Sequence, residues 1–399
     1  MREDVGPPKG KLELNEAEMA RAEAYVAEFG KEIATEPPDE QLDSERRAPR
    51  GISPQVAALQ AIWPANDKDS PDYQHLTSIG VPATFDIVAQ DIETLIAANR
   101  FGPEGFAQTI ALAIRGATLQ SGHEHEKKAA IGLADVRPNH VDYRCVLGFY
   151  YRDAGKMTLF TGSTVPCPYY LREYYKDFHE LPHEYDGKSN MLPSGCYVFR
   201  VDRHRDIRPA LRMAEPGDLT RDATIVVQRT TDDLSFEHGD VWDYPSMPWD
   251  NVHCSYVTSK SSHFEAFFSS AGCLTVRGES TPSEQWKKYQ AVLSGLGAGK
   301  RSDLILLTGR ECAIAAKLRL DTALGDQATV RRELVRLRSG SQGDEVKRLQ
   351  AKLAIAPTGY FGPATKAALV RHQRANGIPS DGIYSPQLDE RLSWGVSLN

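Results

Sequence analysis

The feature that most constrains the fold is a turn that occurs twice near the C-terminus. Gly359-Tyr-Phe-Gly-Pro-Ala-Thr-Lys-Ala-Ala-Leu is echoed 23 residues later by Gly382-Ile-Tyr-Ser-Pro-Gln-Leu-Asp-Glu-Arg-Leu. Each copy has a glycine, an aromatic residue and then a proline, which favours the first position of a helix because its φ is already helical. Upstream, Val346, Leu349 and Leu353 recur at helical spacing and give a third helix one apolar face. The sequence therefore predicts a three-helix module.

The rest of the chain divides by the spacing of its apolar residues. A chain of 399 residues is too long for one ordinary core and indicates two or three domains, at about 150 residues per domain. We expect a multidomain α+β protein with five parts: a charged, largely flexible segment with one helix (1–50), a helical region (51–138), a mostly β domain (139–320), a linker helix (321–336) and the C-terminal module (337–399).

The second and third parts differ in the spacing of their apolar residues. Before residue 139, apolar residues such as Phe85, Ile92 and Ile96 recur at helical spacing, and the same spacing predicts a helix over 106–114. After it, runs rich in β-branched and aromatic residues predict strands, as in Cys145-Val-Leu-Gly-Phe-Tyr-Tyr. The sequence thus predicts a sheet or sandwich for the central domain.

The composition argues against some classes of function. The formal net charge is −7 and no basic run is present, whereas nucleic-acid binders concentrate Lys and Arg to contact phosphates. No run of about 18 apolar residues predicts a membrane span, and residues 1–10 lack the apolar segment of a signal peptide. We therefore expect synthesis in the cytoplasm, no nucleic-acid partner and no membrane span.

One cysteine is set apart by its neighbours. The six cysteines are too sparse for a disulfide framework and form no C-x-x-C pair for zinc, so most are expected to be buried. Cys273 follows Ser270-Ala-Gly, and such small residues leave a sulfur and the nearby backbone N–H groups open to a carbonyl. We expect Cys273 to attack an amide carbonyl, N–H groups near Gly272 and Cys273 to stabilise the oxyanion, and His253 to move the proton.

Several roles around this cysteine have two interpretations. Ser270 can form a hydrogen bond within its own turn or orient His253. Asp250 can orient an imidazole, although the simpler expectation is an exposed loop carboxylate. His263 and His204 are rivals of His253 as the base.

Metal chemistry is the competing interpretation. The candidate ligands are two histidine pairs, His123-Glu-His125 and His179-x-x-x-His183. Pro182 interrupts the helical spacing of the second pair, and no Asp, Glu or Cys cluster completes either site. We expect neither a metal nor another cofactor.

The predicted C-terminal module resembles the peptidoglycan-binding domain appended to many cell-wall hydrolases. The residues that carry the resemblance are 337–353, 359–369, His372-Gln373 and 381–384. His372 stands where that family usually has an aromatic residue, and Thr358 where it usually has Asp. The resemblance implies that peptidoglycan is a partner.

The central domain resembles the catalytic domain of L,D-transpeptidases, which pair an upstream His with a Ser-x-Gly-Cys motif. His253 and Cys273 stand in that arrangement, with 19 residues between them. Leu192-Pro-Ser-Gly-Cys-Tyr-Val-Phe and residues 146–160 resemble two further segments of the family, in the family order. The resemblance implies a thioester mechanism on the stem peptides of peptidoglycan.

The chain departs from that family at two positions beside the cysteine. Ala271 stands where the family usually has His, and Thr275 where an Arg usually helps to bind substrate. Arg277 is the candidate replacement for this Arg, and Asp250 is a second candidate substrate-binding residue.

Together these features predict a peptidoglycan-targeting cysteine acyltransferase or peptidase. An amine that resolves the thioester gives cross-linking or exchange, whereas water gives hydrolysis. Without a signal peptide, the expectation is an effector or lysin that is delivered to the cell wall, in the periplasm or outside the cell, with a delivery apparatus or an immunity protein as further partners. The alternative is a catalytically inert, wall-binding structural component of a phage or secretion apparatus.

Overall fold

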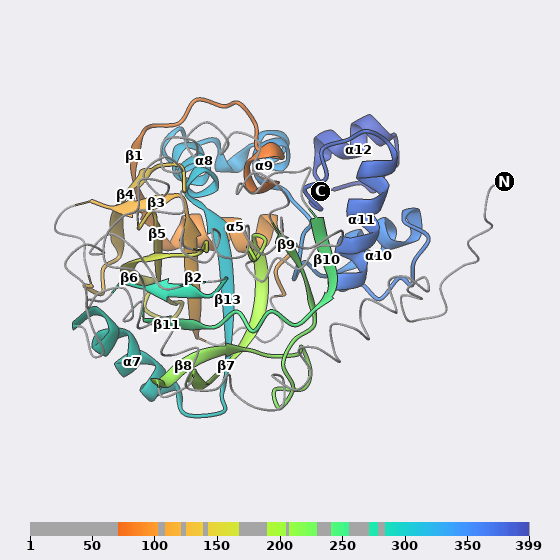
Figure 1. The fold of residues 1–399 in the computed structure, drawn as a ribbon. Helices are drawn as coiled ribbons and strands as arrows, with labels where there is room; N and C mark the ends of the chain where they lie inside the picture. The colour runs from red at the N-terminus through yellow and green to blue at the C-terminus, as the bar shows by residue number, and fades with distance from the viewer. Residues whose placement is uncertain are drawn as a thin grey trace, which may run out of the picture.

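A computed structural model of the protein describes residues 71–102, 108–120, 125–138, 143–166, 190–204, 207–229, 241–254, 270, 272–277 and 284–398. The helix expected within residues 1–50 lies outside this part of the chain. So do several residues named above, which are His123, His179, His183, His263 and Ala271. The described residues form a mixed α+β structure with a β-rich centre and helices toward the C-terminus (Figure 1), which confirms the predicted class.

Eight strands of the described residues close into a barrel. In order around it they are β11 (Val252–Cys254), β12 (Leu274–Val276), β6 (Lys156–Ser163), β5 (Cys145–Tyr151), β2 (Thr109–Arg115), β13 (Arg301–Thr308), β7 (Gly195–His204) and β8 (Ile207–Met213). The pairs β11–β12 and β13–β2 run parallel, and the other pairs run antiparallel. The strands predicted after Cys145 and Cys196 are confirmed as β5 and β7.

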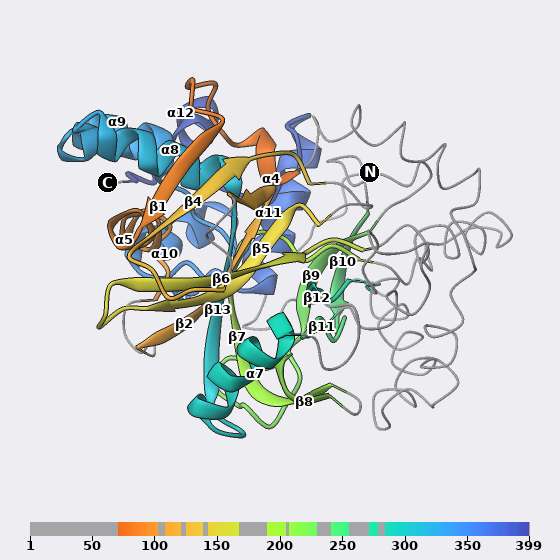
Figure 2. The ribbon, with the colours of Figure 1, turned by 90° about the vertical axis from the view of Figure 1, so that its left-hand side faces the viewer.

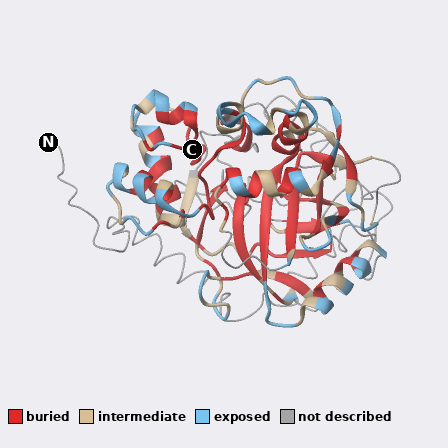
Figure 3. Cartoon of the chain, turned by 180° about the vertical axis from the view of Figure 1, so that it is seen from behind, coloured by how far each residue is buried: buried red, intermediate tan, exposed pale blue. Residues whose placement is uncertain are grey.

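The strand β2 has apolar side chains on both faces. Ile110, Leu112 and Ile114 belong to one hydrophobic core, and Ala111 and Ala113 belong to a second core on the opposite face. Figure 3 shows the central strands buried along most of their length. A strand of this kind gives a continuous apolar run, so periodicity alone does not distinguish it from a buried helix.

The helical region predicted for 51–138 is therefore wrong over much of its described length. A second sheet is formed by β1 (Thr84–Val88), β4 (Ala130–Asp135) and β3 (Ala117–Leu119), in that order. The described helices of the region are α4 (Pro71–Gln74) and α5 (Ala89–Ala98). Because β2 lies between β5 and β13, the barrel takes strands from both sides of the predicted boundary at 138/139.

The remaining elements surround the barrel. They are the hairpin of β9 (Ile225–Arg229) and β10 (Val241–Ser246), the helices α7 (Glu284–Leu296), α8 (Gly309–Leu320) and α9 (Gln327–Leu334), and the short 3-10 helix η3 (Ala323–Gly325). Helix α7 packs beside β8 (Figure 2) and buries Trp286 and Tyr289 in the second core. No helix within the described ranges combines the length and apolar character needed to cross a membrane.

The C-terminal module has the three predicted helices within the continuously described residues 337–398. They are α10 (Asp344–Lys352), α11 (Pro363–Ala375) and α12 (Pro386–Leu392), and a proline stands in the first turn of the last two. His372, which replaces the usual aromatic residue, packs against Trp394 with ring centroids 4.5 Å apart. An imidazole therefore occupies the position of the expected ring.

The module shares its hydrophobic core with the rest of the chain. Val346, Leu349 and Leu369 belong to the same core as residues of β2, α5 and α8. The guanidinium of Arg338, which is fully buried, donates hydrogen bonds to Ser194 Oγ at 2.9 Å and to Glu311 Oε1 at 2.6 Å. Cys196 N–H donates to the Ser339 carbonyl at 2.8 Å. The module thus packs against the barrel and forms hydrogen bonds with it.

Candidate functional site

The predicted nucleophile and base lie on the two adjacent parallel strands β12 and β11. The register pairs Val252 with Leu274 and His253 with Thr275, and Leu274 N–H donates to the Asn251 carbonyl at 2.9 Å. Val252, Cys254, Leu274 and Val276 are fully buried in the second core. Since side chains alternate along a strand, His253 and Cys273 share the opposite face.

The geometry of the strands sets the separation of these two residues. Cys273 is opposite Asn251, and His253 is two residues further along β11. With strands about 4.8 Å apart and a rise of about 3.3 Å per residue, the Cα atoms of His253 and Cys273 are about 8 Å apart. The imidazole of His253 is long enough to approach the Cys273 sulfur across this distance.

Cys273 differs from the other described cysteines in its exposure. It is partly exposed, whereas Cys145, Cys196, Cys254 and Cys312 are buried. Burial raises the pKa of the thiols of Cys145, Cys196 and Cys312, which makes them poor nucleophiles. The expectation of buried cysteines is confirmed for these four.

The sulfur of Cys273 contacts the backbone of the segment that leads into β11. Asn251 N–H donates to Sγ at 3.5 Å, and the thiol donates to the Trp249 carbonyl at 3.7 Å. The N–H contact favours a negative charge on the sulfur, because a backbone donor stabilises a thiolate more than a thiol.

His253 is held by its own strand. The residue is 5% exposed, and Nδ1 lies 2.8 Å from the Cys254 carbonyl oxygen. A carbonyl only accepts, so Nδ1 carries the proton and the lone pair of the neutral ring is on Nε2. This tautomer is the one that a base using Nε2 requires.

His204, the rival base on β7, lies against His253. The two rings stack with centroids 4.4 Å apart and planes 10° apart. His204 Nδ1 is 2.9 Å from Asn251 Nδ2, so it accepts from the amide. Asn251 therefore connects His204 to the cysteine, because its side chain bonds the imidazole and its backbone N–H contacts the sulfur.

Ser270 forms hydrogen bonds within the turn before Cys273. Its hydroxyl donates to the Cys273 carbonyl at 2.6 Å and accepts from Gly272 N–H at 3.1 Å. Of the two roles considered for Ser270, these bonds match the one within the turn. The Gly272 N–H is not available to an oxyanion while it donates to Ser270.

Gly272 is required by the close approach of Asn190. A Cβ atom at position 272 would lie 2.5 Å from the Asn190 side-chain oxygen. Asn190 in turn donates from Nδ2 to Asp250 Oδ2 at 2.7 Å. The turn that carries Cys273 therefore packs on a buried pair of polar side chains.

Asp250 is buried, so the expectation of an exposed loop carboxylate is wrong. It is 1% exposed, and burial raises its pKa to about 7, against the opposing effects of the Asn190 hydrogen bond and of Arg229 and Arg115. Oδ1 has no hydrogen-bond partner in the part of the chain that the structure describes. The carboxyl group contacts Asn190 through Oδ2, so it supports the Cys273 turn, and it bonds no histidine among the described residues.

Arg277 and Thr275 occupy different positions on β12. Arg277 follows the strand at the end away from Cys273, is exposed, and its guanidinium lies 5.5 Å from the Tyr143 ring centre. Thr275 is fully buried opposite His253, and within the described ranges its hydroxyl has no hydrogen-bond partner. The structure thus places Thr275, and not Arg277, beside the histidine.

Sequence reasoning missed Asn190 and Asn251. Alternation along β11 could have indicated Asn251, which shares a face with His253. No local signal marks Asn190, because it is 60 residues from Asp250 in the chain.

No group of three or more His, Cys, Asp or Glu side chains suited to a metal ion occurs among the described residues. His125, the described member of the predicted histidine pairs, stacks on Phe160 with ring centroids 5.5 Å apart.

Comparison with known proteins identifies the C-terminal module. Residues 342–392 match the family described as "Putative peptidoglycan binding domain". The chain is also similar to the zinc D-Ala-D-Ala carboxypeptidase of Streptomyces albus G, at 45% identity over 58 residues. That similarity covers 12% of this chain and 23% of the relative, so the chain spans about a quarter of the relative's length. No solved structure matches the chain.

Proposed function

We propose that the protein is a cell-wall enzyme that acts on peptidoglycan stem peptides through Cys273, with His253 as the base. The observation that carries the proposal is the shared face of β11 and β12, on which the partly exposed Cys273 lies beside a histidine of suitable tautomer. The peptidoglycan-binding module supplies the substrate class. The name of the carboxypeptidase relative also points to the peptide part of the wall.

The proposed reaction is acyl transfer through a thioester. His253 Nε2 takes the proton of the Cys273 thiol, and the sulfur bonds to the carbonyl carbon of a stem-peptide amide. As the tetrahedral intermediate collapses, the C–N bond breaks and the imidazolium returns its proton to the leaving amine. A second amine or a water then attacks the thioester and releases the Cys273 thiol.

Product analysis tests this proposal. The purified protein is incubated with insoluble peptidoglycan, the glycan strands are cleaved with a muramidase, and the muropeptides are compared by mass. We expect new products from the wild type, none from Cys273→Ala, and wild-type products from Cys312→Ala, which removes a buried thiol in α8. A mass gain of one water per bond indicates hydrolysis, whereas a joined or exchanged residue indicates transfer.

The same experiment separates the enzyme from an inert wall-binding component. Identical muropeptides from wild type and Cys273→Ala would contradict the enzyme proposal. Sedimentation of both proteins with insoluble peptidoglycan in that case would support the inert component, because wall binding does not require the thiol.

A further inference from the structure

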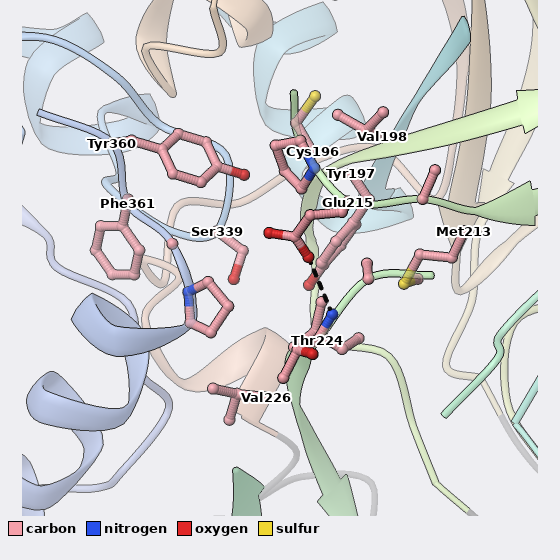
Figure 4. Close-up of a pocket in the computed structure, with 16 residues that line it drawn as sticks. Cys196, Tyr197, Val198, Met213, Glu215, Thr224, Val226, Ser339, Tyr360 and Phe361 are labelled. Carbon is pink, nitrogen blue, oxygen red and sulfur yellow. Dashed lines mark hydrogen bonds between the residues drawn. The ribbon is translucent and has the colours of Figure 1, made fainter. Parts of the chain in front are cut away.

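A pocket lies where the barrel meets the peptidoglycan-binding module. Its volume is about 160 Å³. One side is formed by Met213 at the end of β8, by Glu215, and by Val226 on β9, and the module contributes Tyr360, Phe361 and Pro363 (Figure 4). Pro216, which also lines it, is exposed, so the pocket reaches the surface. The first Gly/Pro turn of the module thus forms one wall, and barrel strands β7 and β8 with the segment that leads into β9 form the other.

Glu215 is the one charged group among the described residues that line this pocket. One carboxylate oxygen, Oε2, accepts from Thr224 N–H at 3.3 Å. Figure 4 shows the carboxylate extending into the space toward Ser339 and the Tyr360 ring. No ion-pair partner for Glu215 occurs in the described part of the chain, so a cation is the ligand that its charge favours.

The rest of the lining is apolar or aromatic. Val198, Met213 and Val226 suit methylene groups, and the Tyr360 ring gives a cation a favourable aromatic neighbour. A cavity of about 150 Å³ holds a group the size of benzene, so this pocket takes one side chain rather than a sugar chain. An anionic group is disfavoured, since Glu215 would repel it.

We propose that the pocket binds an aliphatic primary amine, namely the side chain of a diamino-acid residue in a peptidoglycan stem peptide. The inference rests on the proposed wall-directed function and adds a recognition site that is distinct from Cys273. The methylenes pack on the apolar wall and the ammonium pairs with Glu215. Because each wall comes from a different part of the chain, peptide recognition requires the module and the barrel together.

Calorimetric titration of the full chain tests the inference with two probes. One is a soluble muropeptide with a free side-chain amine on its diamino residue, and the other is the same muropeptide after acetylation of that amine. Acetylation removes the charge, so we expect it to weaken binding about tenfold, as does loss of one charge-assisted hydrogen bond. The substitution Glu215→Gln should weaken binding of the free amine by a similar factor. The variant should therefore bind the two probes with equal affinity.

Glu390→Gln is the matched control, because Glu390 is exposed on α12 and outside the pocket. It should bind both probes as the wild type does. Equal wild-type affinity for the two probes, or wild-type behaviour of Glu215→Gln, would overturn the inference. Sedimentation of the wild type with insoluble peptidoglycan then shows whether wall binding survives. Failure to sediment overturns both the wall-directed function and this inference.

Discussion

His204 and His253 stack face to face, with ring centroids 4.4 Å apart. His204 ends β7 and His253 lies in β11, and β8 separates these strands around the barrel. The closure of the barrel, and not the local sequence, therefore brings the two rings together. The two rings form different hydrogen bonds. Nδ1 of His253 donates to a backbone carbonyl, whereas Nδ1 of His204 accepts from the side-chain amide of Asn251.

This difference predicts unequal effects of substituting the two histidines. His253→Ala removes the proposed base and should lower kcat/KM on purified muropeptides by about 10²- to 10⁴-fold, the usual contribution of a positioned base. His204→Phe keeps an aromatic ring against His253 and loses only the bond to Asn251. It should retain activity within about tenfold of the wild type, as expected for one lost hydrogen bond.

The rate of Cys273 alkylation by iodoacetamide gives a second measurement that does not depend on the substrate. His253→Ala should slow alkylation near neutral pH, and His204→Phe should leave it close to the wild-type rate. A larger loss from His204→Phe than from His253→Ala, in both assays, would assign the base to His204.

Gly272→Ala should disrupt the turn that carries the nucleophile. The added Cβ would lie 2.5 Å from the Asn190 side chain, which is fixed by its bond to Asp250. We expect a loss of about 1–3 kcal/mol in the free energy of unfolding, as for other overpacked sites, and reduced turnover. Urea unfolding measures the first effect.

Asn190→Ala provides the control for this clash. The double variant should be less destabilised than the sum of the two single variants, because alanine at 190 leaves room for the new Cβ. Additive losses in the double-mutant cycle would show that the contact with Asn190 is not the reason for glycine at 272.

The sequence predicts the C-terminal module more completely than the barrel because the signals of the module are local. Pro363 and Pro386 begin helices within a few residues of their turns, as expected. The strand β2 carries no comparable signal. Its two apolar faces are buried against different parts of the chain, and only the assembled fold shows that Ile110 and Ala111 face different cores.

The candidate site also combines residues that local sequence predicts with residues that only the fold brings together. The pair His253 and Cys273 could be predicted because its spacing and small neighbours are visible in one stretch of the chain. Asn190 and the burial of Asp250 could not, because barrel closure brings together residues 60 positions apart. Carboxylates are ordinarily exposed, so nothing in the local sequence indicates that Asp250 is buried.

The bond between Arg338 and Glu311 predicts that the module unfolds with the barrel. Burial opposes the ionisation of Glu311, but the charge of Arg338, together with the neighbouring His75 side chain, holds its pKa well below the usual range. Arg338→Met would leave this carboxylate buried without its main partner, at a cost of about 3–5 kcal/mol. We expect one calorimetric transition in the wild type and a single transition at lower temperature in the variant.

Arg338→Met combined with Glu311→Gln is the control, because it removes both charges. This double variant should recover part of the lost stability, since a neutral amide is less costly to bury than an unpaired carboxylate. Two separate transitions in the wild type would contradict the shared core of module and barrel.

The burial of Asp250 predicts a stability that falls as pH rises toward neutrality. Its pKa in the folded protein is about 7, above its ordinary value of 3.8, so the folded state binds the proton more tightly than the unfolded chain. The stabilisation is complete below about pH 4 and is lost as pH rises to about 7, beyond which it stays constant. The loss over this window is about 4 kcal/mol, at about 1.4 kcal/mol per pH unit.

Asp250→Asn removes this titration while keeping an acceptor for the Asn190 amide. Urea unfolding of both proteins between pH 4 and pH 8 should therefore show a free-energy difference that changes with pH in favour of the variant. Because other groups titrate equally in the two proteins, the difference isolates position 250. A constant difference across the window would mean that Asp250 keeps an ordinary pKa in the folded protein, and the buried Asn190–Asp250 pair would then not hold a proton beneath the Cys273 turn.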